Sequence, residues 1–438
     1  MHATEIILGQ TLSFTGDPFV DGPDAARVET NGAVAIRNGK ITAVGSAESI
    51  KSNVTHANII DMGEHLLMAG FVDAHVHYPQ TAITASWGKR LIDWLNTYTF
   101  PEESRFGNQN YAQSIANTYC DFALANGTTT AASFCTIHPV SVDAYFTAAA
   151  ARNMRMVGGK TCMDRNAPGE LRDTAKSAYD DSKALIDRWH DQGRAIYAIT
   201  PRFSPTSTED QLAALGALWL ERPGCRMQTH LSEQQEEISW VRKLFPNARD
   251  YLDTYEHHGL VREGAIMGHA IHLTSREITK MRETGAAVAH CPTSNKFIGP
   301  GLCDVKGLNA AGITTGLATD TGGGSSFSML RTMAAAYEVA QLRGDALHAS
   351  QLLYLATVGS AKALSVSDKI GNLVVGNEAD LIALNLASTA PIKLSAARAS
   401  DIWESIFPTI MMGDDRAIGG VWIAGQRVSV TAQPNAGP

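Results

Sequence analysis

Long hydrophobic runs are missing from this sequence of 438 residues. A membrane-spanning helix needs about 18 consecutive apolar residues, and no segment approaches that length. The first residues, MHATEIILGQ, contain no basic stretch followed by a long apolar core, so a secretory signal is not indicated. We therefore expect a cytoplasmic protein that does not insert into a membrane.

Paired cysteines and basic clusters are missing as well. The six cysteines are scattered without a C-x-x-C motif, which predicts reduced thiols rather than a disulfide framework. Charged residues make up only 18% of the chain, the net charge is −8, and lysine and arginine form no cluster. Nucleic acid is therefore not an expected partner, and a small molecule is expected instead.

What the sequence does contain is an alternation of short apolar runs and longer amphipathic segments, which is typical of strand–helix units around a parallel sheet. Helical patterns occupy residues 111–127 and 275–285, the second beginning with Ser275 as its predicted N-cap and ending at Gly285. Eight repeats predict an α/β fold, a closed TIM-like (β/α)₈ barrel. The eight apolar runs are residues 66–77, 128–136, 155–164, 195–203, 226–233, 265–273, 286–294 and 314–322.

The two ends of the chain have strand patterns instead. Residues 32–45 place Asn38 and Gly39 between two alternating runs, which is a strong hairpin signal, and residues 419–430 repeat the arrangement around another glycine-containing turn. Each end is too short to fold comfortably alone, so we predict that they join in one small β-sandwich domain. The predicted parts are 1–69 and 372–438 for the sandwich and 70–371 for the barrel.

Histidines one residue apart, His75 and His77, end the first apolar run. Side chains two positions apart in a strand point the same way, which suits a pair of metal ligands. The pair alone is weak evidence, because the chain contains 14 histidines. Polar or aromatic residues also end four other runs: Arg202 and Phe203, His230 and Glu233, His269, and Asp320.

The C-terminal ends of barrel strands meet at one rim, where active sites of this fold lie. We therefore predict that His75, His77, His230 and Asp320 bind one divalent metal ion, Zn²⁺ or Fe²⁺. Each residue has a simpler explanation: His230 as a core histidine, Asp320 as a turn residue, Glu233 as a favourable first-turn helix carboxylate. Those explanations do not account for their common position at strand ends.

The predicted ligands suggest a hydrolytic mechanism. A metal held by imidazoles lowers the pKa of bound water and yields hydroxide, which would attack the substrate. Glu233 would shuttle the protons, Asp320 would accept a hydrogen bond from the attacking water, and His269 would polarise the electrophile or steady the oxyanion. His290, in the seventh run, is expected to lie in the middle of a strand and to have a structural or supporting role.

The segments GFVDAHVH, THLSE, GHA, HCPTSN and ATD resemble the amidohydrolase superfamily, in its single-metal branch. HYPQTA, LIDWLNTYTFPEESRF, KTCMDRNAP, AITPRFSPTS and HCPTSNKFIGPGL resemble the guanine deaminase family. That resemblance implies conversion of guanine and water to xanthine and ammonia by a homodimer in purine catabolism. It also implies that the following residues contact the purine: Gln80, Arg202, Phe203, His230 and His269. Trp87 would form a wall of the pocket, and Trp94 would either form another wall or pack in the core.

Alternatives remain at this point. The substrate could be a related base such as a pterin, 8-oxoguanine or cytosine, since closely similar rings are told apart by few contacts. A two-metal imidase or amidase would need a carboxylated Lys160, whereas the resemblance favours an unmodified lysine with a structural or charge-pairing role. A non-catalytic scaffold is the remaining possibility, and such a protein would be expected to have lost a ligand or Glu233.

Overall fold

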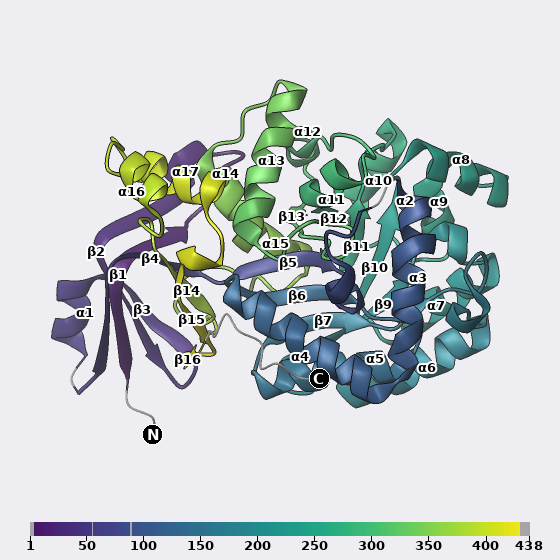
Figure 1. Cartoon of the computed structure of the whole chain (residues 1–438), viewed down its shortest axis with the longest axis horizontal. Helices are drawn as coiled ribbons and strands as arrows, with labels where there is room; N and C mark the ends of the chain where they lie inside the picture. The colour runs from purple at the N-terminus through teal and green to yellow at the C-terminus, as the bar shows by residue number, and fades with distance from the viewer. Residues whose placement is uncertain (1–3, 55, 88–89, 430–438) are drawn as a thin grey trace.

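The protein, described here by a computed structural model covering residues 4–54, 56–87 and 90–429, consists of a barrel and a smaller sheet domain beside it. In Figure 1 the sheet domain lies on the left, formed by the first and last parts of the chain, and the barrel lies on the right. The predicted fold, an eight-stranded barrel with a small β-domain built from both ends, is confirmed.

Eight strands form the barrel in the order in which they occur along the chain, and each neighbouring pair is parallel. Each lies within one of the apolar runs, because strands covered on both sides need continuous apolar residues. The short β8 (Thr161–Cys162) pairs with β9 off this path. The strands are β5 (Phe71–Val76), β6 (Thr128–Phe134), β7 (Arg155–Gly159), β9 (Ala195–Pro201), β10 (Arg226–Leu231), β11 (Ala265–His269), β12 (Ala287–His290) and β13 (Thr315–Leu317).

Helices follow the strands and surround the barrel (Figure 1). The segment between β5 and α4 contains α2 (Leu91–Trp94), a π-helical turn (Leu95–Thr99) and α3 (Phe100–Glu103). The other barrel helices are α4 (Gln109–Ala125), α5 (Pro139–Ala151), α6 (Ala175–Trp189), α7 (Glu209–Glu221), α8 (Gln235–Leu244), α9 (Tyr251–Glu256), α10 (Ser275–Thr284), α11 (Pro292–Phe297), α12 (Val305–Ala310), α13 (Met329–Arg343), α14 (Ala349–Tyr354) and α15 (Ser360–Ala363).

The barrel closes between β13 and β5 just beyond the end of β13. The backbone N–H of Asp320 donates to the carbonyl of His75 at 3.0 Å, and that of His77 donates to the carbonyl of Thr321 at 3.2 Å. The Asp73 carboxylate, buried in β5, accepts hydrogen bonds from the N–H and the hydroxyl of Thr319 at 3.0 and 2.5 Å. Three residues of the predicted metal site, His75, His77 and Asp320, therefore lie on the seam of the barrel.

One predicted strand is divided in the structure. Residues 66–77 form one apolar run in the sequence, but the run breaks at Gly70, between β4 (Asn58–Ala69) of the small domain and β5 of the barrel. A Cβ atom at Gly70 would lie 2.3 Å from the Thr129 side chain, so only glycine fits where the chain passes between the domains.

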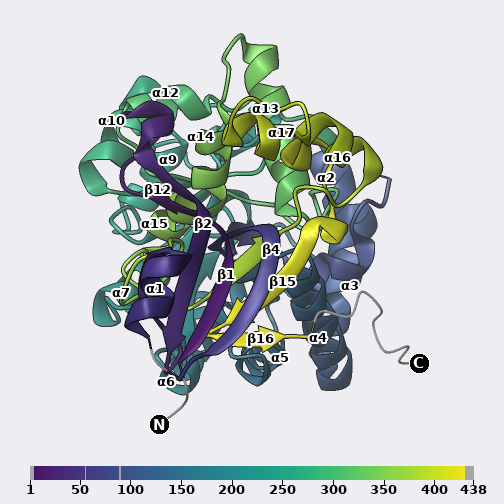
Figure 2. The same ribbon diagram turned by 90° about the vertical axis from the view of Figure 1, so that its left-hand side faces the viewer.

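A β-sandwich was predicted for the small domain, whereas its strands form one continuous mixed sheet of seven, in the order β16-β15-β14-β4-β1-β2-β3 (Figure 2). Both predicted hairpins are present, with left-handed Asn38–Gly39 and Ala424–Gly425 at their turns. Helix α1 (Ala47–Asn53) follows β3, while α16 (Ala390–Ala396) and α17 (Ile402–Met412) lie between β14 and β15. The strands are β1 (Glu5–Phe14), β2 (Ala26–Arg37), β3 (Lys40–Ser46), β4, β14 (Leu381–Leu384), β15 (Ile418–Ile423) and β16 (Gln426–Val428).

Helix α10 ends as predicted, but its N-cap lies one residue earlier than predicted. Gly285 adopts a left-handed φ of 74° at the C-terminus. The N-cap is Thr274 rather than Ser275, because the Thr274 hydroxyl accepts from the N–H of Glu277 while the Glu277 carboxylate accepts from the N–H of Thr274. This reciprocal pair is a capping box, which the sequence TSRE allows only from Thr274.

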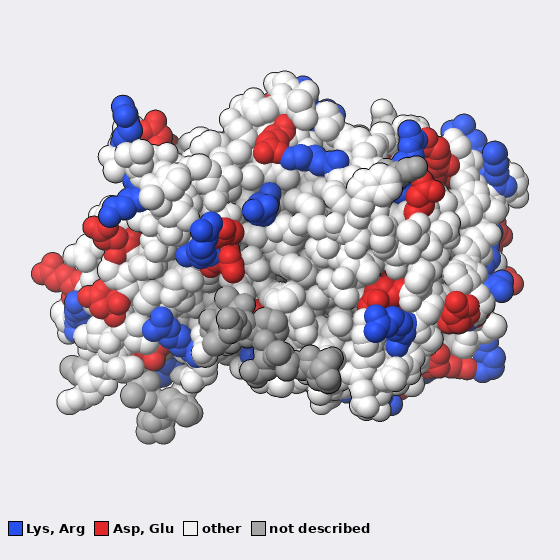
Figure 3. Space-filling model, viewed as in Figure 1, with Lys and Arg blue, Asp and Glu red and all other residues white. Residues whose placement is uncertain are grey.

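Within the part of the chain that the structure describes, no helix has the length and apolar character needed to cross a bilayer. On the face shown in Figure 3, acidic and basic side chains lie interspersed, often next to one another. All six cysteines are buried and none forms a disulfide.

Candidate active site

Three histidine rings, from His75 on β5, His77 just after it and His230 on β10, meet at the C-terminal end of the barrel. The Nε2 atoms of His77 and His230 lie 3.2 Å apart, and the ring of His75 is centred 4.8 Å from that of His230. The carbonyl of Arg202 accepts from Nδ1 of His230 at 2.7 Å, which turns Nε2 of His230 toward the other rings. The alternation of β5 and the parallel register of β10 thus bring the predicted imidazoles together.

Asp320 completes this cluster from the loop after β13. Its Oδ1 atom lies 3.5 Å from Nε2 of both His75 and His77. Asp320 has a left-handed φ of 48°, and His269, at the end of β11, has a φ of 65°. Non-glycine residues rarely adopt this conformation, and such strain concentrates at functional sites.

The donor set fits a divalent metal ion. His75, His77 and Asp320 offer ligand atoms within 4.8 Å of one another, as do His75, His230 and His269. Among the described residues, neither ring nitrogen of the buried His75 has a hydrogen-bond partner, although buried polar groups normally have one. Burial lowers the pKa of His75 and holds those of His77 and His230 well below the ordinary value, which keeps the rings in the neutral form that binds metals.

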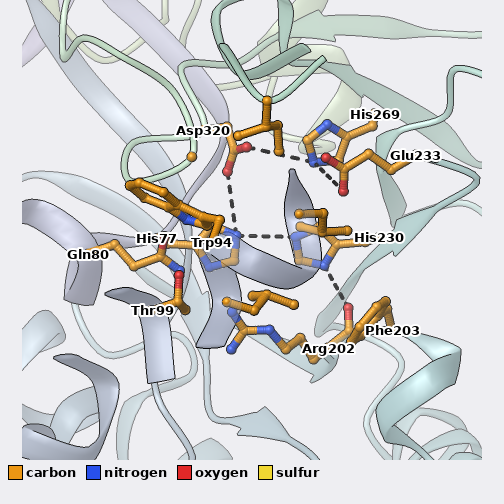
Figure 4. A pocket seen from close by; sticks show the side chains of 14 residues that line it. His77, Gln80, Trp94, Thr99, Arg202, Phe203, His230, Glu233, His269 and Asp320 are labelled. Atoms are coloured by element: carbon orange, nitrogen blue, oxygen red, sulfur yellow. Dashed lines mark hydrogen bonds and ion pairs between the residues drawn. The ribbon is translucent and has the colours of Figure 1, made fainter. Parts of the chain in front are cut away.

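Glu233 and His269 face this cluster from the ends of β10 and β11 (Figure 4). Nε2 of His269 lies 3.7 Å from a carboxylate oxygen of Glu233 and 3.7 Å from one of Asp320. Burial raises the pKa of Glu233 to about 8, with the charges of Glu237 and Asp320 adding to the effect and His269 opposing it. Such a carboxyl group can both accept and release a proton near neutral pH.

A hydrogen bond with Asn295 fixes the orientation of the His269 ring. Its Nδ1 atom lies 3.0 Å from Oδ1 of Asn295, and because an amide oxygen only accepts, Nδ1 carries a proton. Burial lowers the pKa of His269, but the charges of Glu233 and Asp320 outweigh that effect and raise it overall. Nε2 is therefore presented to the two carboxylates.

A pocket opens above this cluster and encloses about 420 Å³ that no atom fills, its open mouth included. Apart from the cluster itself, the wall contains Gln80, Arg202 and Phe203, as expected for purine contacts, and Trp94 (Figure 4). The other wall residues are Leu91, Leu95, Thr99, Ile298 and Gly323.

Trp87 is not brought to the pocket. Its side chain is 72% exposed, in the loop between β5 and α2. Trp94 is buried within α2, and only this tryptophan of the pair lines the pocket. Trp87 and Trp94 lie in one short segment of the sequence, and the conformation of that segment determines which of the two side chains faces the pocket.

Three residues at the site were not singled out in the sequence. Phe134, at the end of β6, places its ring 4.8 Å from those of His75 and His77 and shields them from water. Asn295 holds His269, and Glu103 binds the Arg202 guanidinium at 2.6 Å. Phe134 lies two residues before the end of the second apolar run, which is the one signal that placed it near the rim.

Neither Lys160 nor His290 belongs to the groups of described residues that could hold a metal ion. The Lys160 ammonium pairs with the Asp173 carboxylate at 2.5 Å, and both are buried. His290 is the last residue of β12, not a mid-strand residue as expected, because β12 is only four residues long. Its buried ring has no hydrogen-bond partner among the described residues, and burial lowers its pKa to about 3.

The chain is similar to known proteins along almost its whole length. The amidohydrolase family model matches residues 66–428. Guanine deaminase from Escherichia coli strain K12 is 40% identical to this chain over 432 residues, covering 98% of each sequence.

Two solved structures extend the similarity to the fold. An E. coli guanine deaminase structure matches with a TM-score of 0.95 at 39% identity, covering 97% of this chain and 99% of that one. A C. acetobutylicum guanine deaminase with guanine bound in its active site matches with a TM-score of 0.87 at 28% identity, covering 97% and 100%. The chain therefore belongs to the amidohydrolase family, in the group that the guanine deaminases form within it.

Proposed function

We propose that this protein is a metal-dependent aminohydrolase that converts guanine and water to xanthine and ammonia. The observation that carries the proposal is a cluster of three imidazoles and a carboxylate at the floor of a pocket whose wall holds Gln80, Arg202 and Phe203. The 40% identity to guanine deaminase over 98% of the chain supports the choice of substrate.

The residues that would hold the metal are His75, His77, His230 and Asp320. Zn²⁺ is the proposed ion and Fe²⁺ the alternative, since both accept imidazole and carboxylate ligands. When bound, such an ion lowers the pKa of a water molecule toward neutrality and makes it a nucleophile. The neutral rings of the three histidines are ready to bind it without first losing protons.

Proton transfer is assigned to Glu233. Its raised pKa lets it take a proton from the attacking water and deliver that proton to the departing amino nitrogen. Asp320 accepts a hydrogen bond from the same water and orients its lone pair toward the ring carbon. His269, held by Asn295, donates from Nε2 to a polar atom of the purine next to the reacting carbon.

Base recognition is assigned to the opposite wall. The Arg202 guanidinium donates to acceptor atoms of the purine, the Gln80 amide accepts from its N–H groups, and the Phe203 ring covers its plane. These groups suit a neutral, flat heterocycle that has donors and acceptors along its edges. Residues Leu91, Leu95 and Ile298 exclude water from the remaining faces.

Ammonia release from a panel of bases, together with the metal content of the purified protein, tests the proposal. We expect guanine to be preferred over pterin, 8-oxoguanine and cytosine by at least about tenfold in kcat/KM, with about one ion per chain. A tenfold preference for another base would contradict the assignment of guanine. Two ions per chain with a mass increment on Lys160 would favour the imidase or amidase alternative instead.

Assembly and setting follow from the family resemblance. We propose a homodimer that acts in the cytoplasm in purine catabolism. Sedimentation equilibrium of the purified protein tests the assembly, and a monomer at micromolar concentration would contradict it. Fractionation of cells that express the protein tests the location.

A further inference from the structure

A buried acidic residue lies behind the wall that is assigned to base recognition. Glu103, the last residue of α3, is almost fully buried. Its two carboxylate oxygens accept from Nη1 and Nη2 of Arg202 at 2.6 and 3.2 Å. One of these oxygens also accepts from Nε2 of Gln80 at 3.0 Å. Glu103 thus binds both polar groups of the wall at once.

The carboxylate fixes which end of the Gln80 amide faces the ligand. A carboxylate only accepts hydrogen bonds, so it holds the NH₂ end of the amide and leaves Oε1 as an acceptor for a donor in the pocket. It also engages one N–H on each terminal nitrogen of Arg202, so the remaining donors of the guanidinium are held in a fixed plane. The wall is therefore preorganised with one acceptor beside a set of donors.

Glu103 also sets the charge of the wall. The Arg202 side chain is 4% exposed and that of Glu103 is 1% exposed, so the pair is screened little by solvent. Without Glu103 the pocket would contain an uncompensated cation, which attracts anions. Guanine is neutral near neutral pH, whereas xanthine, in which a carbonyl replaces the amino group, is the stronger acid and more readily becomes an anion.

We propose that Glu103 is a positioning residue that fixes Gln80 and Arg202 and, by neutralising Arg202, makes the pocket prefer neutral guanine over anionic xanthine. The inference rests on the proposed function, since it concerns the substrate and product of that reaction. It assigns to Glu103 two effects: tighter substrate binding and easier product release.

A matched control is the neighbouring Glu102. It is also buried, but it binds Arg105 at 3.0 Å and the hydroxyl of Tyr111, and it contacts neither Gln80 nor Arg202 through any hydrogen bond. Replacing either glutamate by glutamine keeps the side-chain shape and removes a charge. The two variants differ in whether the lost charge lies behind the pocket wall.

The test compares the wild type with Glu103→Gln and Glu102→Gln in guanine turnover and in competitive inhibition by xanthine, at a mildly alkaline pH where xanthine is largely the anion. In Glu103→Gln we expect KM for guanine to rise about 10- to 100-fold with a smaller change in kcat. Inhibition by xanthine, measured relative to that KM, should strengthen about tenfold or more. In Glu102→Gln both quantities should stay at the wild-type value, and metal content should be equal in all three proteins.

An unchanged xanthine-to-guanine ratio in Glu103→Gln, or the same change in Glu102→Gln, would overturn the proposal. If Glu103→Gln does not fold, Arg202→Gln is compared with the double variant Glu103→Gln/Arg202→Gln, which has no unpaired buried charge. Adding Glu103→Gln to Arg202→Gln should then strengthen xanthine binding about tenfold, and no change would overturn the proposal. A wild type that releases no ammonia from guanine would contradict the proposed function, and the inference with it.

Discussion

At the scale of residues, Glu233 is placed for proton transfer by its surroundings. It is 2% exposed, one of its carboxylate oxygens has no hydrogen-bond partner among the described residues, and the other faces His269. Glu237 accepts hydrogen bonds from the N–H groups of Glu233 and Gln234 at 2.9 and 3.0 Å and so holds the backbone at this point. Glu233 therefore has a fixed backbone and a carboxyl group free to exchange a proton.

Replacing Glu233 by glutamine should lower kcat about 10²- to 10⁴-fold, because the amide cannot carry the proton. The metal content, measured by elemental analysis, should stay at the wild-type value, since Glu233 is not among the proposed ligands. Glu236→Gln is the control, because the Glu236 side chain is 67% exposed and pairs with Arg90 on the surface. Near-normal turnover in Glu233→Gln would remove the proposed role.

His290 allows a prediction about pH and stability. Burial lowers its pKa from 6.5 to about 3, so between these values the unfolded chain binds a proton that the folded chain does not. The contribution of His290 to stability is therefore full above pH 6.5 and falls as the pH decreases toward 3. In that window this one group should change the free energy of unfolding by about 1.4 kcal/mol per pH unit.

The variant His290→Gln should show a shallower dependence of the free energy of unfolding on pH, by about one proton, in denaturant titrations across the acidic range. His56→Gln, which removes a histidine from the surface, shows whether the loss of any histidine has the same effect. Equal slopes for His290→Gln and the wild type would contradict the prediction.

At the scale of elements, the cap of α10 gives different roles to Thr274 and Ser275, two adjacent residues that both carry a hydroxyl group. Thr274→Ala should lower the free energy of unfolding by about 1 kcal/mol, because it leaves the N–H of Glu277 without its side-chain acceptor. Ser275→Ala should have little effect, since Ser275 is the first helical residue and lies exposed. Denaturant unfolding of both variants checks this, and a larger loss in Ser275→Ala would contradict the observed cap.

The strands were predictable because each buried barrel strand is a short apolar run, and the rim residues were predictable because they follow those runs. The first apolar run does not itself reveal the break at Gly70, because apolar residues continue across it, although the predicted boundary between the domains falls between residues 69 and 70. Thr274 was missed because two hydroxyl residues stand side by side, and only the capping box with Glu277 distinguishes them.

The pocket wall was harder to predict than the metal cluster. Glu103 lies in a short helix of a connecting segment and reaches Arg202 across a long stretch of sequence, so no spacing pattern points to it. Trp87 and Trp94 differ in exposure for the same reason: the path of the segment between β5 and α4 depends on tertiary packing. Periodicity identifies strand ends, but it does not determine how such connections fold over them.

At the scale of the whole molecule, an ion-pair network joins the two domains. The Glu378 carboxylate, in the segment before β14, binds Arg155 at 2.5 Å and Arg194 at 2.6 Å, and Arg194 also binds Asp380. Arg155 begins β7 and Arg194 precedes β9, so the network lies at the N-terminal end of the barrel strands, opposite the active site. Burial raises the pKa of Glu378, but the two arginines outweigh burial and lower it to about 2.

Glu378→Gln should lower the free energy of unfolding by about 3 kcal/mol, because two largely buried arginines lose a shared partner. Asp180→Asn is the control: it removes an ion pair with Lys176 on the surface, and the unfolding midpoint should not change measurably. Guanine turnover per folded molecule should be unaffected, since the network is remote from the pocket. Equal midpoints for Glu378→Gln and the wild type would show that the network does not stabilise the domain junction.

The seam of the barrel has a consequence for the order of events during synthesis. The proposed ligands stand on β5, on β10 and after β13, so a nascent chain that has not yet emerged as far as Asp320 lacks a complete coordination sphere. Ion capture must then come late, after the first and the last barrel strands have met. We therefore expect the chain to form its barrel first and to bind the metal ion afterwards, in a separate and final step.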